Sequence, residues 1–177
     1  MRCFTLLLCA VATVAEAQQP VASESVRVES VPPPPPPPAV PPYATPTPEQ
    51  TRYMRGLSTA GRGINQLKDG VNRVANAGRD SLRMRRAGRL LSGLCGTARG
   101  FMVTGRGRMQ PTAYQDSTAL KAKRLGAQID TLIRFAPTCE AKAAAQPDST
   151  SARLLSQLRA YEAALRDFRA AIGLPNK

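Results

Sequence analysis

Residues 47–78, TPEQTRYMRGLSTAGRGINQLKDGVNRVANAG, contain the pattern that decides the fold. Thr47 suits an N-cap, Pro48 suits the first helical position, and Gln50 stands where a capping box closes back on its cap. The apolar residues that follow recur at alternating steps of four and three: Tyr53, Leu57, Ala60, Ile64, Leu67, Val71 and Val74. This spacing predicts a long helix with one apolar face, which must pack against partner helices.

Glycines recur within this helix. Gly56, Gly61, Gly63 and Gly70 lie off the apolar seam, and each lowers helix propensity by up to about 1 kcal/mol relative to alanine. The helix therefore depends on packing for its stability.

A second helix is predicted after a break at residues 76–78, with Asp80 or Ser81 as its cap. Its apolar stripe consists of Met84, Ala87, Leu91, Leu94, Cys95, Ala98 and either Phe101 or Met102. The stripe passes through a glycine-rich segment, residues 92–111, that invites comparison with a phosphate-binding loop.

That segment, SGLCGTARGFMVTGRGRMQP, lacks the features of a nucleotide site. It has neither the third glycine of a dinucleotide fingerprint nor a P-loop lysine, and no β-branched run precedes it as a strand. We interpret it as a helix end. Gly93, Gly96 and Gly100 are then points of close helix approach, and residues 105–111 form the linker that follows.

Two more helices follow from the same kind of pattern. The third begins between Thr112 and Ser117 and ends at Ala136, because Pro137 comes next. Its inward side chains are Leu125, Ile129, Leu132 and Ile133.

The fourth helix begins near Asp148 or Ser149, carries Glu162 and Arg166 as a surface pair, and ends at residues 173–175, Gly-Leu-Pro. Its apolar stripe is Leu154, Leu158, Tyr161, Leu165, Phe168 and Ile172. We therefore expect an all-α fold, a small bundle of about four helices formed by residues 49–177.

The first 48 residues carry signals of another kind. Residues 1–17 combine Arg2, a short apolar run and the cleavage-site pattern Ala15-Glu16-Ala17, which predicts a cleaved signal peptide and a periplasmic or secreted protein. Residues 18–48 include VPPPPPPPAVPPYATPTP, which predicts a proline-rich linker that is disordered or extended as polyproline II. This linker suits a stalk or a plain leader better than a ligand for a proline-recognising groove.

Cleavage leaves two cysteines, Cys95 and Cys139, and an oxidising compartment favours a disulfide between them. A straight hairpin turning near residue 108 would separate them by roughly 25 Å along the helix axis, whereas bridged α-carbons lie about 6 Å apart. Three explanations stay open: a long return loop over residues 105–116, a chain that folds back after Pro137, or thiols that do not pair. We favour the return loop, because glycine and proline weaken that segment as a helix.

Several classes of chemistry are disfavoured. The chain has no histidine, which excludes Cys-His catalysis and His-ligated zinc. Two distant cysteines make a poor metal site, and the acidic residues are scattered singly rather than paired. We expect no enzyme activity, no metal and no cofactor.

Charge gives the strongest indication of function. Residues 52–108 contain 13 Lys and Arg against only Asp69 and Asp80, or +11 of the chain's +13. Five arginines lie on the side of the second helix opposite its apolar stripe: Arg79, Arg83, Arg85, Arg86 and Arg89. Arginine suits bidentate contacts to phosphate, although a solvated face without a partner is the plainer alternative.

These observations favour an exported envelope protein, a binding or structural module that turns a basic helical face toward lipid head groups, lipopolysaccharide or an acidic protein. The alternative is an amphipathic protein that associates with a membrane surface, and a hydrolase is the least favoured. Nucleic acid is disfavoured because Tyr53, Tyr161 and Phe168 lie on predicted core stripes, which leaves few aromatic side chains to stack on bases.

Overall fold

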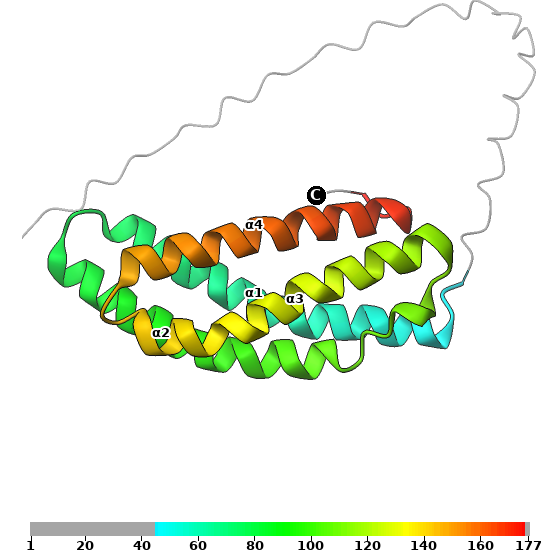
Figure 1. The fold of residues 1–177 in the computed structure, drawn as a ribbon, viewed down its shortest axis with the longest axis horizontal. Coiled ribbons are helices and arrows are strands. Elements are labelled where there is room, and N and C mark those ends of the chain that lie inside the picture. The colour runs from blue at the N-terminus through cyan, green and yellow to red at the C-terminus, as the bar shows by residue number, and fades with distance from the viewer. Residues whose placement is uncertain (1–44, 176–177) are drawn as a thin grey trace, which may run out of the picture. The chain divides into compact units, whose positions relative to one another are not determined.

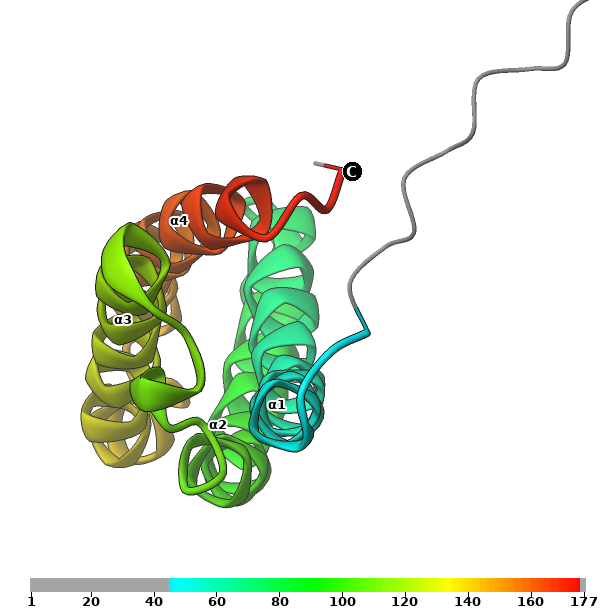
Figure 2. The same ribbon diagram turned by 90° about the vertical axis from the view of Figure 1, so that its right-hand side faces the viewer.

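The computed structural model describes residues 45–175, so the predicted signal peptide and most of the predicted linker lie outside the described residues. The described part consists of α1 (Pro48–Ala77), α2 (Ser81–Arg106), α3 (Asp116–Lys142) and α4 (Pro147–Ala171), with a 3-10 turn, η1 (Pro111–Ala113), before α3. These helices form an antiparallel bundle (Figure 1). Seen end-on, they follow one another round the bundle in chain order (Figure 2). The prediction of a small all-α bundle is confirmed.

Local sequence signals set the starts of the first two helices as predicted. Thr47 Oγ1 accepts a hydrogen bond from the backbone N–H of Gln50 at 3.2 Å. The backbone N–H of Thr47 donates to the side-chain Oε1 of Gln50 at 3.0 Å, which completes the capping box of α1. Asp80 caps α2 by accepting from the amides of Leu82 and Arg83 at 2.9 and 3.0 Å.

The helices α1 and α2 approach each other at three glycines of α1 that are spaced seven residues apart. A β-carbon built on Gly63 would lie 2.5 Å from the carbonyl oxygen of Ala98, so only glycine allows this approach. The contacting pairs are Gly56 with Gly105, Gly63 with Ala98, and Gly70 with Leu91. The prediction that the α1 glycines lie off the apolar seam is therefore wrong for Gly56, Gly63 and Gly70, which are buried against α2, whereas Gly61 has no other part of the protein near its β-carbon position.

The glycines of α2 also differ from expectation. Gly93 and Gly100 have no other part of the protein within 4 Å of where a β-carbon would lie, because they stand on the outward side of the helix. Gly96 does face α3, through the side chain of Glu140. Gly105, predicted to lie in the linker, is helical and buried against α1. At the end of the predicted stripe, Met102 is buried and Phe101 is partly exposed.

Cys95 and Cys139 form a disulfide between α2 and α3, with their α-carbons 6.0 Å apart. Both are fully buried. The register is reset by the connection over residues 107–115, which corresponds to the favoured return loop. Arg106, the last residue of α2, pairs with Asp130, so that the first half of α3 runs past the end of α2.

Arg106 also holds the return loop in place. Arg106 Nη2 donates to Asp130 Oδ2 at 3.0 Å and its Nη1 donates to the Met109 carbonyl at 3.1 Å. The guanidinium lies against Gly126, where a β-carbon would come within 3.2 Å of it. Beyond Arg106, Met109 is 1% exposed, and the Tyr114 ring packs against Tyr53, with ring centroids 5.2 Å apart.

The prediction that Pro137 ends the third helix is wrong, because α3 continues to Lys142 with Pro137 inside it. Proline removes one backbone hydrogen bond, but the turn that follows is held by other contacts. Cys139 is fixed by the disulfide, and Ser92 Oγ donates to the Glu140 carbonyl at 2.6 Å. Tertiary packing therefore outweighs the local signal.

α4 ends as predicted. Gly173 has φ of 73°, and the Leu174 amide donates to the Arg169 carbonyl at 2.9 Å, which is a Schellman arrangement. The predicted surface pair of Glu162 with Arg166 is not formed. Glu162 makes an ion pair with Lys68 of α1 instead, with Oε1 of Glu162 2.6 Å from Nζ of Lys68.

Candidate anion-binding surface

The fold places the positive charge of the chain on one helical hairpin. Residues 52–108, which we call the basic hairpin, comprise nearly all of α1 and α2 and the turn that follows. They hold 13 Lys and Arg against two acids, for a net +11, whereas residues 116–171 of α3 and α4 hold nine against six, for a net +3. The charge is therefore unevenly divided between the two halves of the bundle.

The five arginines predicted from the sequence are all exposed. Arg79 lies in the turn before α2 rather than on the helix, and Arg83, Arg85, Arg86 and Arg89 follow on its first turns. Arg83 pairs with the carboxylate of its own cap, Asp80, at 3.3 Å. Hydrogen bonding from the Arg83 amide, together with that from the Leu82 amide, holds the pKa of Asp80 below its usual value.

The structure divides these arginines between two sides of α2. Arg83 and Arg86 line an open hollow of about 410 Å³ between α1 and α2, together with Arg73 from α1. Arg85 and Arg89 are not part of that hollow. Sequence reasoning missed Arg73, although a tight turn at residues 78–80 places the last turns of α1 beside the first turns of α2.

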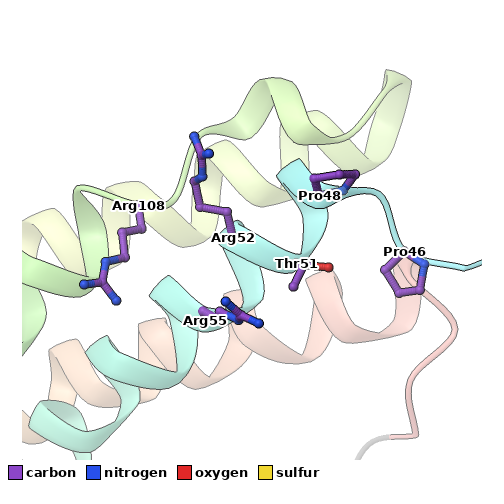
Figure 3. A pocket seen from close by; sticks show the side chains of 6 residues that line it. All are labelled: Pro46, Pro48, Thr51, Arg52, Arg55 and Arg108. Carbon is purple, nitrogen blue, oxygen red and sulfur yellow. The ribbon is translucent and has the colours of Figure 1, made fainter.

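A second group of arginines lies at the other end of the hairpin. Arg52 and Arg55 from the start of α1 and Arg108 from the turn after α2 line a hollow of about 480 Å³, with Pro46, Pro48 and Thr51. Figure 3 shows that the three arginines come from two separate segments of the chain, Arg52 and Arg55 from α1 and Arg108 from the segment after α2. Gly56 makes this possible, because a β-carbon there would lie 3.0 Å from Cβ of Arg108. No sequence pattern joined these residues, since they meet only through the packing of α1 on α2.

Few of the basic side chains are neutralised within the bundle. Among the described residues, three of the 13 in the basic hairpin have a carboxylate within ion-pair distance, namely Lys68, Arg83 and Arg106. The other ten face solvent or the two hollows without such a partner. An unpaired guanidinium keeps its planar fork of donors available to a phosphate or carboxylate, which it can hold through two parallel hydrogen bonds.

Other kinds of site find little support among residues 45–175. No group of three His, Cys, Asp or Glu side chains there is placed to hold a metal ion. Both cysteines are consumed in the disulfide, so neither offers a thiol. In the same part of the chain, none of the helices combines the length and apolarity that a membrane crossing requires.

Fold and surface together define a small antiparallel helical bundle, closed by one disulfide, with a strongly basic hairpin. No known protein family, no curated protein and no solved structure matches the chain.

Proposed function

We propose that this chain is an exported envelope protein, and that its helical bundle is a binding or structural module whose basic hairpin recognises anionic partners. The observation that carries the proposal is the set of ten basic side chains in residues 52–108 without a carboxylate partner among the described residues. Export rests on the pattern of residues 1–17.

Arginine dominates this surface, and arginine is suited to phosphate. The chain holds 20 Arg among its 25 basic residues, and a guanidinium binds phosphate in a fixed planar geometry that an ammonium lacks. A surface of one sign also raises the local concentration of oppositely charged partners, and salt screens that attraction over about 10 Å at 0.1 M. Lipid head groups, lipopolysaccharide phosphates and acidic proteins are the partners that meet these conditions outside the cytoplasm.

The apolar stripe of α2 favours this proposal over its alternative, an amphipathic helix lying in a membrane surface. Leu91, Cys95, Ala98 and Met102 are fully buried within the bundle, so this side of α2 has no free surface to offer to lipid. The absence of enzyme activity stays a prediction.

Charge reversal tests the proposal. We expect the variant with Arg83, Arg85, Arg86 and Arg89 all changed to Glu to lose at least tenfold in affinity for anionic vesicles and lipopolysaccharide at low salt, and the parent to lose affinity as salt rises. Glutamate at the start of α2 is compatible with the helix dipole, and circular dichroism checks the fold.

A matched control changes the same number of charges elsewhere on the bundle. Lys123, Arg134, Arg159 and Arg166 are exposed on α3 and α4 and belong to none of the ion pairs among the described residues. Changing these four to Glu lowers the net charge equally and is expected to weaken binding much less. Equal losses in the two variants would mean that net charge, rather than this surface, governs binding, and the proposal would be wrong.

A further inference from the structure

An exposed leucine stands among the arginines at one end of the basic hairpin. Leu82, in the first turn of α2, is 62% exposed, and it is flanked in sequence by Arg79, Arg83, Arg85 and Arg86. Leu90, two turns further along α2, is 42% exposed and lines the hollow that holds Arg73. We call residues 73–90 the basic tip.

The basic tip has almost no compensating acid. Residues 73–90 hold six arginines and one acidic residue, for a net +5. That acid, Asp80, is already engaged as the cap of α2 and as the partner of Arg83. Five arginines are thus free to meet an external anion.

The tip is also accessible, because it projects past the neighbouring turn. Gly88 packs against the Ala143 carbonyl and the Pro147 ring at the turn between α3 and α4. Residues 78–87 therefore lie beyond that turn, and Figure 1 shows the α1–α2 turn extending past it at the left-hand end of the bundle. A flat surface approaching from this end would meet the tip first.

We propose that the basic tip docks on a bilayer that contains anionic phospholipids, with Leu82 entering the boundary between head groups and acyl chains while the arginines bind lipid phosphates. This inference rests on the proposed function and names its partner. A soluble polyanion would bind the arginines but would leave the Leu82 side chain in water. An anionic bilayer binds the arginines through its phosphates and also buries Leu82.

The expected contributions are large enough to measure. A basic residue close to an anionic membrane surface contributes about fivefold in partitioning, and moving a leucine side chain out of water contributes about tenfold. The arginines therefore supply most of the attraction, and Leu82 supplies the part that depends on the bilayer.

Tryptophan fluorescence tests insertion directly, because the chain contains no tryptophan. Leu82→Trp places a single reporter at the tip, and Leu120→Trp places one at a site in α3 that is similarly exposed, at 69%. With vesicles of phosphatidylcholine and phosphatidylglycerol, the emission of Leu82→Trp is expected to shift to shorter wavelength and to become protected from an aqueous quencher. Leu120→Trp should show neither change, and vesicles of phosphatidylcholine alone should leave both unaffected.

Serine substitutions separate this inference from the proposed function. We expect Leu82→Ser to lose about tenfold in affinity for the anionic vesicles but to keep its affinity for soluble polyphosphate, and Leu120→Ser to match the parent on both. If Leu82→Ser binds vesicles as tightly as the parent while the four-arginine reversal does not, membrane docking is wrong and anion recognition stands. If the four-arginine reversal also binds the vesicles as tightly as the parent, both membrane docking and anion recognition are wrong.

Discussion

At the scale of single residues, the contact of Gly63 with α2 leaves no room for a methyl group. Gly63→Ala would place a β-carbon 2.5 Å from a backbone oxygen of α2, and relief requires the helices to move apart. We expect a loss of about 2–3 kcal/mol in the free energy of unfolding.

Gly61 is the matched control for this prediction. It lies two residues away on the same helix, and no other part of the protein comes within 4 Å of where its β-carbon would lie. Gly61→Ala is expected to stabilise the protein by up to about 1 kcal/mol through helix propensity alone. Urea denaturation measures both variants, and equal effects would show that α1 and α2 do not approach each other this closely.

Tyr161 makes the free energy of unfolding depend on pH in the alkaline range. It is 4% exposed, and burial, helped by the nearby Glu162 carboxylate, raises its pKa to about 12. Its unfolded pKa is about 10, so above that value the unfolded chain releases the proton while the folded chain retains it. Stability that is fully present below pH 10 is therefore lost as the pH rises toward 12.

The variant Tyr161→Phe removes this contribution. Between about pH 10 and 12, the parent is expected to lose on the order of 2–3 kcal/mol more than the variant, measured by denaturation at a series of pH values. Tyr53 also has a pKa raised by burial and acts in the same direction in both proteins. If the free energies of unfolding of parent and variant fall in parallel as the pH rises, the pKa of Tyr161 is not raised by burial.

At the scale of elements, local signals predicted the caps at which the first two helices begin, whereas α3 and α4 begin without a side-chain cap, and packing decided where two of the helices end. The capping box at Thr47 and the cap at Asp80 depend on residues within one turn, which a sequence displays directly. Gly105 and Pro137 both sit inside helices despite their low helix propensity. Gly105 is held by contact with α1, and the turn after Pro137 is held by the disulfide of Cys139 and by the hydrogen bond from Ser92. Periodicity along one helix cannot reveal such contacts.

Pro137 is expected to lower the stability of α3. An interior proline costs up to about 3 kcal/mol, and Pro137 is exposed, so replacing it removes no core packing. We predict that Pro137→Ala raises the free energy of unfolding by about 1–3 kcal/mol, measured by thermal and urea denaturation. A less stable variant would indicate that the ring makes contacts that the helix needs.

The disulfide joins α2 and α3 across a sequence separation of 44 residues. In the chain-entropy description, a loop of this size stabilises the fold by about 4 kcal/mol. Reduction is expected to lower the denaturation midpoint accordingly, with no loss of helical content in the absence of denaturant. An unchanged midpoint after complete reduction, verified by thiol titration, would contradict this.

At the scale of the whole molecule, the sequence predicted the basic surface in part. The excess of arginine over residues 52–108 was visible, as was the group at Arg79–Arg89. The hollow at Arg52, Arg55 and Arg108 was not, because the residues that form it come from separate segments of the chain. Composition predicts the return loop that lets Cys95 and Cys139 meet, whereas the Arg106 contacts that hold this loop are seen only in the structure.

Anion recognition by the basic hairpin is tested most directly by mapping where an anionic surface touches the bundle. Backbone amide resonances of the full chain are followed while bicelles of phosphatidylcholine and phosphatidylglycerol are added at low salt. We expect shifts concentrated in residues 73–90, weaker shifts elsewhere in the basic hairpin, and reversal on adding salt. Shifts confined to α3 and α4, or none at all, would mean that the basic hairpin is not the binding surface.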